Sequence, residues 1–303
     1  MPLSAEKITA LEEVAYQIRR LSVEMITYGR WGHIGGSFSL AELLAVLYFH
    51  AMHVKPDDPH WAERDRLILS KAHASPALYA AMALRGYFPI DALYTYCELG
   101  GLLEGHTDLR RTPGLESSGG PLGMGLSVAA GMALGLRFKG NPGPRVFCIL
   151  GDGETNEGNV WEAAMSAAHY HLDNLIAIVD YNKVMAKGFV WDLMSVEPYA
   201  EKWSSFGWDV LEVDGHDIPA IAQALHEARW VRPRGKPIVI IAHTVKGRGV
   251  RMCEFNYKWH THAPDPKTAD TMLRELSRNY GRPEEGYSRL SADTDKEVFY
   301  GGE

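Results

Sequence analysis

The first third of the chain repeats apolar positions at the three- and four-residue spacing of amphipathic helices. Residues 5–29 keep this spacing and end at a glycine, which is typical of a helix with a glycine stop. The segment SLAELLAVLYFHAM predicts a second helix, in which Ser39 and Glu42 would form a capping box. In SPALYAAMALRG we expect Ser75 to cap a third helix whose first position holds Pro76.

The pattern changes after Gly120. The glycine-punctuated segment GPLGMGLSVAAGMALGLRF predicts a loop that enters a buried helix. Short apolar runs follow, with the helical segments GNVWEAAMSAAHY and IPAIAQALHEARWV between them. The predicted strands are residues 146–150, 175–180, 209–213 and 237–245. Near-continuous apolar strands separated by helices indicate an α/β fold, a doubly wound parallel sheet with both faces covered.

The C-terminal residues are polar from DPKTAD onward. We expect residues 265–303 to form an irregular extension on the surface or on a partner. Residues 1–264 would then form the folded domain.

Composition narrows the classes of function. A chain of 303 residues with 46% apolar side chains can bury a full core, and a net charge of −7 gives no reason to expect nucleic acid or an anionic membrane as a partner. Its three cysteines lie far apart and form no CxxC pair, which argues against a disulfide framework or a thiolate metal site. With charged residues near its N-terminus and no apolar run of membrane-spanning length, the chain is expected in the cytoplasm.

Candidate chemistry lies where two predicted strands end. The turn Gly-Asp-Gly at residues 151–153 follows one strand, and Asn182 follows the next. Because adjacent parallel strands end at the same sheet edge, we expect Asp152 and Asn182 to converge. Their oxygens suit Mg²⁺ bound together with phosphate groups, and the glycines leave amides free for phosphate oxygens. The alternative is an ordinary turn and a strand-ending cap.

The stretch from GDGETNEGNVWEAA to IVDYN resembles the thiamine diphosphate motif of the transketolase family. Four further segments resemble family segments in the family's order: WGHIGGSFSLAE, RLILSKAHASPALYA, EGHTDLRRTPGLESSGGPLGMG and HTVKGRGVRMCEFNYKWHTHAP. The resemblance covers residues 30–264 and implies a thiamine diphosphate-binding fold. Two departures are Ile34 and Ala72, which stand where the family has proline and glycine.

The resemblance implies roles for individual residues. Mg²⁺ would be bound by the side chains of Asp152 and Asn182 and by the backbone carbonyl of Val184. Histidines facing the sugar would be catalytic, namely His33, His106 and His260, with His262 as an alternative to His260. Cofactor contacts would come from His73, Gly120, Leu122, Gly153, Glu154, Asn182 and Lys246. Glu162 resembles a glutamate that links two cofactor sites, but it is equally typical of a helix surface charge.

The family's activating glutamate, which contacts the aminopyrimidine ring of the cofactor, belongs to a second domain in transketolases. The resemblance therefore implies the diphosphate-binding subunit of a split transketolase, inactive without a partner subunit that carries the pyrimidine-binding domain. An α2β2 tetramer is the expected assembly. The expected reaction transfers a two-carbon ketol unit from a phosphorylated or otherwise anionic ketose to an aldose. The alternatives are the α subunit of a 2-oxoacid or acetoin dehydrogenase, and a non-catalytic binding subunit.

The segment DYNKVMAKGFVWDLMS departs most from the family. Family members have a polar loop here, whereas Met185, Lys187, Phe189 and Trp191 make this loop bulkier and more basic. One hypothesis is that the loop adapts the site to an unusual sugar, with Lys187 attracting an anionic one. The alternative is a loop that only packs against the partner chain.

Overall fold

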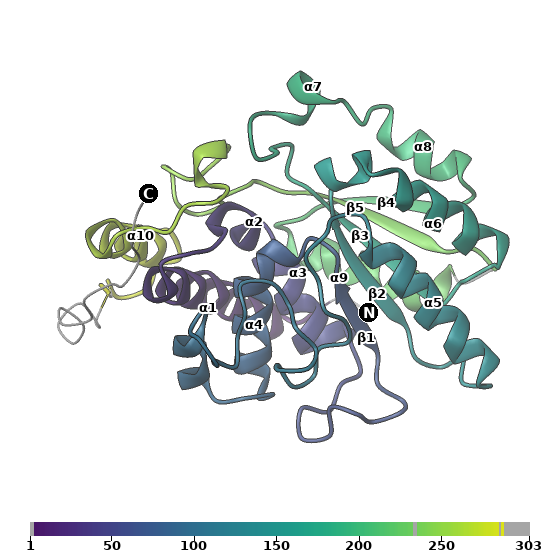
Figure 1. Cartoon of the computed structure of the whole chain (residues 1–303), viewed down its shortest axis with the longest axis horizontal. Coiled ribbons are helices and arrows are strands. Elements are labelled where there is room, and N and C mark those ends of the chain that lie inside the picture. The colour runs from purple at the N-terminus through teal and green to yellow at the C-terminus, as the bar shows by residue number, and fades with distance from the viewer. Residues whose placement is uncertain (1–2, 233–234, 285, 288–303) are drawn as a thin grey trace.

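Five parallel strands in the order β1-β2-β3-β5-β4 form the centre of the computed structural model, which describes residues 3–232, 235–284 and 286–287 (Figure 1). The strands are β1 (Arg66–Leu69), β2 (Val146–Gly151), β3 (Leu175–Tyr181), β4 (Asp209–Asp214) and β5 (Ile238–His243). The four strands predicted from the sequence and the α/β class are confirmed. β1 was not predicted as a strand, because four residues are too few to show a period.

Helices of eight residues or more cover the sheet. They are α1 (Ala5–Gly29), α4 (Ser75–Arg85), α5 (Gly125–Phe138), α6 (Gly158–His169), α9 (Ile218–His226) and α10 (Pro266–Asn279). Shorter helices are α2 (Ile34–Phe38), α3 (Ala41–Val46), α7 (Val190–Leu193) and α8 (Tyr199–Ser205). Single helical turns complete the set: Leu47–Ala51, Ala72–Ala74, Ile90–Thr95, Gly153–Asn156, Glu227–Val231 and Tyr257–Trp259.

Alternate strand residues build two cores, one on each face of the sheet. Phe147, Ile149, Ile176 and Ile178 pack with α1, α3, α4, α9 and α10. Neighbouring strand residues point the other way and pack with α5, α6 and α8, which lie together on one side of the sheet in Figure 1. Burial on both faces explains why the strands read as continuous apolar runs.

Of three predicted helix ends, one agrees with the structure and two do not. α1 ends at Gly29 as expected, but Arg30 takes the left-handed conformation, and a Cβ on Gly29 would lie 2.7 Å from the Tyr96 ring. The capping box was wrong, because the Ser39 hydroxyl donates to Asp180 and Glu42 is held by Arg19. Ser75 begins α4 but does not cap it, since its hydroxyl donates to the carbonyl of Gly105.

The expectation of an irregular C-terminal segment was wrong for residues 266–279. These form α10, capped by the Asp265 side chain, which accepts from the amide of Thr268. Its apolar face, including Met272 and Leu276, is buried in the same core as α1. Because polar residues cover only the outer face, the overall polarity concealed an amphipathic helix. The predicted domain boundary between residues 264 and 265 stays a prediction. Residues 288–303 of the predicted extension lie outside the described residues.

A buried charge cluster ties α1 to α3. The Arg19 guanidinium donates to both carboxylate oxygens of Glu42 at 2.6 and 2.7 Å, and the His216 ring lies 2.9 Å from the same carboxylate. Burial alone would raise the pKa of Glu42, but the charge of Arg19 and the His216 hydrogen bond outweigh it and hold that pKa well below its usual range.

We expect Glu42→Gln to lower the free energy of unfolding by about 3 kcal/mol at pH 7, because Arg19 would stay buried without its counter-charge. Since the pKa of Glu42 is lower in the folded than in the unfolded chain, this contribution is present above the ordinary value of 4.5 and is lost at more acidic pH. Urea unfolding monitored by tryptophan fluorescence measures both effects. Glu12→Gln on the exposed side of α1 is the control, and an equal result for both variants would contradict the expectation.

Two sequence expectations concern absences. The described cysteines, Cys97, Cys148 and Cys253, form no disulfide. Among the helices of the described residues, none is long and apolar enough to span a bilayer.

Candidate functional site

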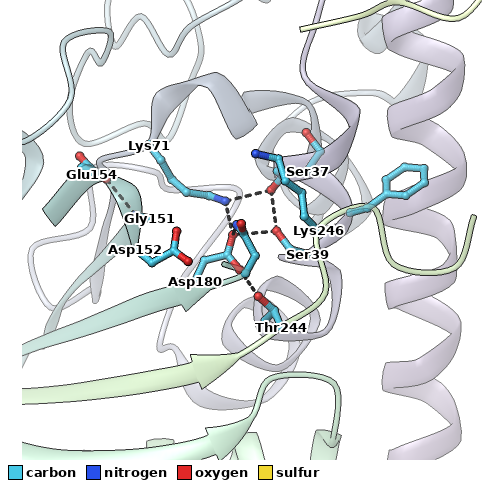
Figure 2. Close-up of polar contacts among 12 residues, drawn as sticks. Ser37, Ser39, Lys71, Gly151, Asp152, Glu154, Asp180, Thr244 and Lys246 are labelled. Carbon is cyan, nitrogen blue, oxygen red and sulfur yellow. Dashed lines mark hydrogen bonds and ion pairs between the residues drawn. The ribbon is translucent and has the colours of Figure 1, made fainter. Parts of the chain in front are cut away.

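Polar residues gather where four neighbouring strands end. Ser70 and Lys71 follow β1, Asp152 follows β2, Asn182 follows β3, and Thr244 and Lys246 follow β5. Because all strands are parallel, these residues lie along one edge of the sheet (Figure 2). α2 lies over the same edge and brings His33 and Ser37.

Asp152 and Asn182 converge as the sequence predicted. Gly151 is in register with Asp180, and the Asp152 amide donates to the Asp180 carbonyl. The Asp152 carboxylate accepts from the amides of Gly153 and Lys183, so it spans the two strand ends. Burial, followed by the charge of Asp180, raises the pKa of Asp152 to about 6. A metal ion at this carboxylate would relieve that unfavourable charge.

Lys183 makes the turn that presents the next backbone oxygen. Its φ of 70° is left-handed, and its carbonyl accepts from the amide of Val190. The Val184 carbonyl accepts from the Lys246 ammonium at 2.6 Å, and the Val184 amide donates to the Asn182 side-chain oxygen at 3.1 Å. The sequence predicted metal-binding oxygens on Asp152, Asn182 and Val184. In the structure these residues are linked by hydrogen bonds through the Lys183 and Val184 amides.

Glu154 is buried, but its oxygens are directed into the protein. One oxygen accepts from the Ser70 hydroxyl and the Gly123 amide, and the other accepts from the Gly151 amide. Glu154 thus fixes the Gly-Asp-Gly turn against the loop before α5. The cofactor contact predicted for Glu154 stays a prediction, and its side-chain oxygens are already held by donors of this chain.

A third buried carboxylate, Asp180, was missed by the sequence reasoning. It forms an ion pair with Lys71 and accepts from Ser39, Asn182 and Thr244, as the dashed lines in Figure 2 show in part. Asp180 lies two residues before Asn182 in IVDYN, and Lys71 lies within the LSKAH segment. Their pairing across 109 positions left no local pattern in the sequence.

Lys246 is almost fully buried beside these groups. Its ammonium donates to Val184 and lies 2.9 Å from the Nδ1 atom of His260. Burial, followed by the charge of Lys71, lowers the pKa of Lys246 to about 8. A buried ammonium group that contacts a carbonyl and an imidazole rather than a carboxylate is well placed to receive an anion.

Four imidazoles form a cluster next to Lys246. The ring of His33 lies 5.0 Å from that of His73, 6.1 Å from that of His106 and 5.2 Å from that of His260, centre to centre. His262 is exposed and packs against Trp259, although its backbone pairs with that of His33. The structure thus places His260, and not His262, in the cluster.

The surroundings keep these rings uncharged. Burial is the largest cause for each of them; it lowers the pKa of His33 to about 4 and that of His260 to about 3, helped by neighbouring cations and imidazoles. The pKa of His73 is also well below its usual range, and that of His106 is lowered by burial. Neutral imidazoles can both donate to and accept from hydroxyl groups, which suits a polyol ligand.

Trp31 adds an aromatic wall that the sequence reasoning did not identify. Its ring lies 4.9 Å from that of His33 and 5.5 Å from that of His106. A Cβ on Gly105 would come within 2.4 Å of the indole, so the glycine before His106 makes room for Trp31. The signal in the sequence for Trp31 was its position directly before Gly32 and His33.

The remaining residues named from the sequence are less enclosed than the histidine cluster. A Cβ on Gly120 would meet open space, and Leu122 is 41% exposed. Glu162 is exposed on α6, so the structure leaves both interpretations of it open. In the 185–191 loop, the Met185 side chain covers Gly153, where a Cβ would lie 2.7 Å from it, and Lys187 is exposed. The rings of Phe189 and Trp191 stack on each other at 4.6 Å.

The donor set fits Mg²⁺ bound with a diphosphate. Within the described residues, no group of three or more His, Cys, Asp or Glu side chains could hold a metal ion. A cation here would therefore need the amide and carbonyl oxygens of Asn182 and Val184 together with phosphate oxygens. The Nδ1 atom of His33 is also buried without a hydrogen-bond partner in the described part of the chain, and a ligand could supply one.

A family model described as "Transketolase, thiamine diphosphate binding domain" matches residues 11–285. The 6-deoxy-6-sulfo-D-fructose transketolase subunit SqwG of Clostridium sp. (strain MSTE9) is 46% identical over 250 residues, which cover 82% of this chain and 90% of that protein. An apulose-4-phosphate transketolase subunit from Actinobacillus succinogenes is 39% identical over 267 residues, covering 88% of this chain and 95% of that protein.

Solved structures show the same fold. The transketolase of Campylobacter jejuni superposes with a TM-score of 0.84 at 30% identity, over 94% of this chain and 44% of that chain. The transketolase of Pichia stipitis in complex with a sedoheptulose phosphate gives a TM-score of 0.84 at 31% identity, over 92% of this chain and 42% of that chain. The chain spans less than half of these solved enzymes but at least 90% of the length of the two transketolase subunits named above.

Proposed function

The chain belongs to the transketolase family, and from that premise we propose that it is the diphosphate-binding subunit of a two-chain transketolase. The reaction would transfer a two-carbon ketol unit from an anionic ketose to an aldose. The observation that carries the proposal is the joint presence of the Asp152, Asn182 and Val184 oxygens, the buried Lys246 and the four-imidazole cluster at one sheet edge.

The proposed cofactor residues would form two groups, one that binds the metal and one that contacts the diphosphate. Asp152, Asn182 and the Val184 carbonyl would hold Mg²⁺, while Lys246 would contact the diphosphate. Contrary to the sequence prediction, the amides of Gly151 and Gly153 are not free, since they donate to Glu154 and Asp152, so Gly153 would reach a phosphate oxygen only by leaving Asp152. His73, Gly120 and Leu122 would border the cofactor, and Glu154 would hold the Gly-Asp-Gly turn in place. Bound thiamine diphosphate supplies the carbon nucleophile and the electron sink that ketol transfer needs.

The histidines would handle the sugar. His33, His106 and His260 can orient its hydroxyl and carbonyl groups, and because they are neutral they can take up a proton at an imidazole nitrogen and then return it. Trp31 limits the space beside two of them. Catalysis would then depend on positioning and proton transfer by residues of this chain.

A partner chain would complete the site. Both relatives named above are called transketolase subunits, which supports a second chain carrying the pyrimidine-binding domain and its glutamate. The expected α2β2 tetramer would cover apolar side chains that α5, α6, α7 and nearby loops expose, namely Leu122, Met124, Phe138, Met165, Trp191, Leu193 and Met194. The absence of disulfides among the described residues agrees with a reducing, cytoplasmic location.

The substrate proposal rests on charge. The names of the relatives specify a sulfonated ketose in one case and a phosphorylated ketose in the other. In this chain Lys187 is exposed in the loop that begins with Met185 over Gly153, where it could attract an anion approaching the site. The alternative role of this loop is contact with the partner chain, and exchanging residues 185–191 for a polar family loop separates the two roles.

The test is ketol transfer by the chain mixed with its partner, thiamine diphosphate and Mg²⁺. With an aldose acceptor, we expect kcat/KM for 6-deoxy-6-sulfo-D-fructose or a ketose phosphate to exceed that for unsubstituted D-fructose by about tenfold or more. The reason is that one charge-assisted contact contributes at least about 1.4 kcal/mol. Turnover of a 2-oxoacid with a lipoyl-domain acceptor would instead identify a dehydrogenase. Failure to bind thiamine diphosphate would identify a non-catalytic subunit.

A further inference from the structure

Asp180 is the most fully enclosed carboxylate of the site. Its side chain is 0% exposed, and its carboxylate oxygens accept from hydrogen-bond donors and form an ion pair with Lys71. One oxygen accepts from the Ser39 hydroxyl at 2.7 Å and the Asn182 amide group at 2.8 Å, and also pairs with Lys71. The other oxygen accepts from Thr244. Asp180 therefore joins the ends of β1, β3 and β5 to the segment between α2 and α3.

Lys71 is held as tightly as its partner. Its ammonium donates to the Gly36 carbonyl at 3.0 Å in addition to Asp180, and the side chain is 2% exposed. A Cβ on Gly36 would lie 3.5 Å from the Lys71 nitrogen and 3.3 Å from the His73 ring. The Lys71 ammonium therefore lies against α2, and Figure 2 shows its side chain extending to Asp180.

Two buried carboxylates consequently share one sheet edge. Asp152 follows Gly151, which is in register with Asp180 on the neighbouring strand. Asp152 accepts from two backbone amides, whereas Asp180 is surrounded by side-chain donors. A divalent cation attracts every carboxylate within reach, and two carboxylates together with a diphosphate would place excess negative charge around one Mg²⁺.

We propose that Lys71 is a positioning residue that keeps Asp180 out of the metal coordination shell, so that Asp180 orients the Asn182 amide toward the cation. The inference rests on the Mg²⁺ site of the proposed function. The Asn182 amide nitrogen donates to Asp180, and its oxygen accepts from the Val184 amide with one lone pair, so a second lone pair can serve a metal. Lys71 neutralises Asp180, and the four contacts of the carboxylate hold it in place.

The competing role for Lys71 is direct contact with the diphosphate, as a second cation beside Lys246. The two roles differ in what happens when Asp180 is neutralised as well. If Lys71 serves Asp180, removing both charges leaves no free carboxylate and binding recovers. If Lys71 binds phosphate, the second change cannot replace the lost contact.

The experiment compares the wild type with K71M and K71M/D180N in the complex with the partner chain. Isothermal titration calorimetry measures the dissociation constant of thiamine diphosphate in excess Mg²⁺. We expect at least tenfold weaker binding for K71M, and recovery of at least half of that loss, on a logarithmic scale, for K71M/D180N. The control is K267M, which removes an exposed lysine of α10 and should leave the dissociation constant unchanged.

Several results would overturn the inference: wild-type affinity in K71M, or recovery of less than half of the loss in K71M/D180N. If K71M does not assemble, the double variant decides alone, because it buries no unpaired charge. Binding within tenfold of the wild type then supports the inference, and a larger loss overturns it. Failure of the wild-type complex to bind the cofactor would instead refute the proposed function, which keeps the two failures distinct.

Discussion

Purified alone and supplied with thiamine diphosphate, Mg²⁺ and both sugars, the chain is expected to produce no ketol-transfer product, and addition of the partner chain should restore turnover. The reason lies in the carboxylates. In the described part of the site, the buried ones are Asp152, Glu154 and Asp180, and each is held by donors of this chain. On the proposed function, the glutamate for the aminopyrimidine ring would come from the partner chain. A coupled assay for the aldehyde product measures the effect.

The partner alone is the matched control and should be equally inactive, because it lacks the metal and diphosphate residues. A titration at fixed total cofactor should reach maximal activity at equal amounts of the two chains. Product formation by the single chain, above the rate without enzyme, would refute the division of the site between two subunits.

The second large effect is expected for Asp152→Asn. The substitution keeps the shape of the side chain but removes the only charged oxygen among the three proposed metal donors, so Mg²⁺-dependent cofactor binding should weaken by about 100-fold or more. Turnover should fall in parallel at limiting cofactor. Calorimetric titration of the complex with thiamine diphosphate, at several Mg²⁺ concentrations, measures the loss.

The same variant should fold normally. Burial raises the pKa of Asp152, so removing its charge should favour the folded metal-free chain, whereas the amide nitrogen of Asn cannot accept from a backbone amide as both Asp152 oxygens do. Because the two effects oppose each other, we expect the free energy of unfolding to change by no more than about 2 kcal/mol. Asp192→Asn, on the exposed side of α7, is the control. An Asp152→Asn variant that keeps wild-type affinity for Mg²⁺ and cofactor would exclude Asp152 as a metal ligand.

The sequence predicted those parts of the site that depend on strand ends. Parallel strands covered on both faces must be apolar throughout, so their limits were readable, and adjacent strand ends had to bring Asp152 and Asn182 together. The resemblance to the family then supplied the histidines, and the structure gathers His33, His73, His106 and His260 within one cluster.

Contacts between distant segments could not be predicted in this way. Ser39 looked like a helix cap because a serine before an amphipathic run has that local meaning, yet its hydroxyl is used by Asp180, 141 positions away. Lys71 and Asp180 looked like ordinary neighbours of a motif. Only the folded chain shows that they neutralise each other.

The exposed Phe138 at the end of α5 has a consequence for the cell. Phe138 is 83% exposed, and Met165 and Tyr170 at the neighbouring helix α6 are half exposed. A chain without its partner therefore presents an exposed apolar patch to solvent. Synthesis in excess of the partner would leave orphan subunits prone to self-association and to capture by chaperones. The abundance of the two polypeptides must therefore be balanced, and a mutation that lowers expression of one should also deplete the other.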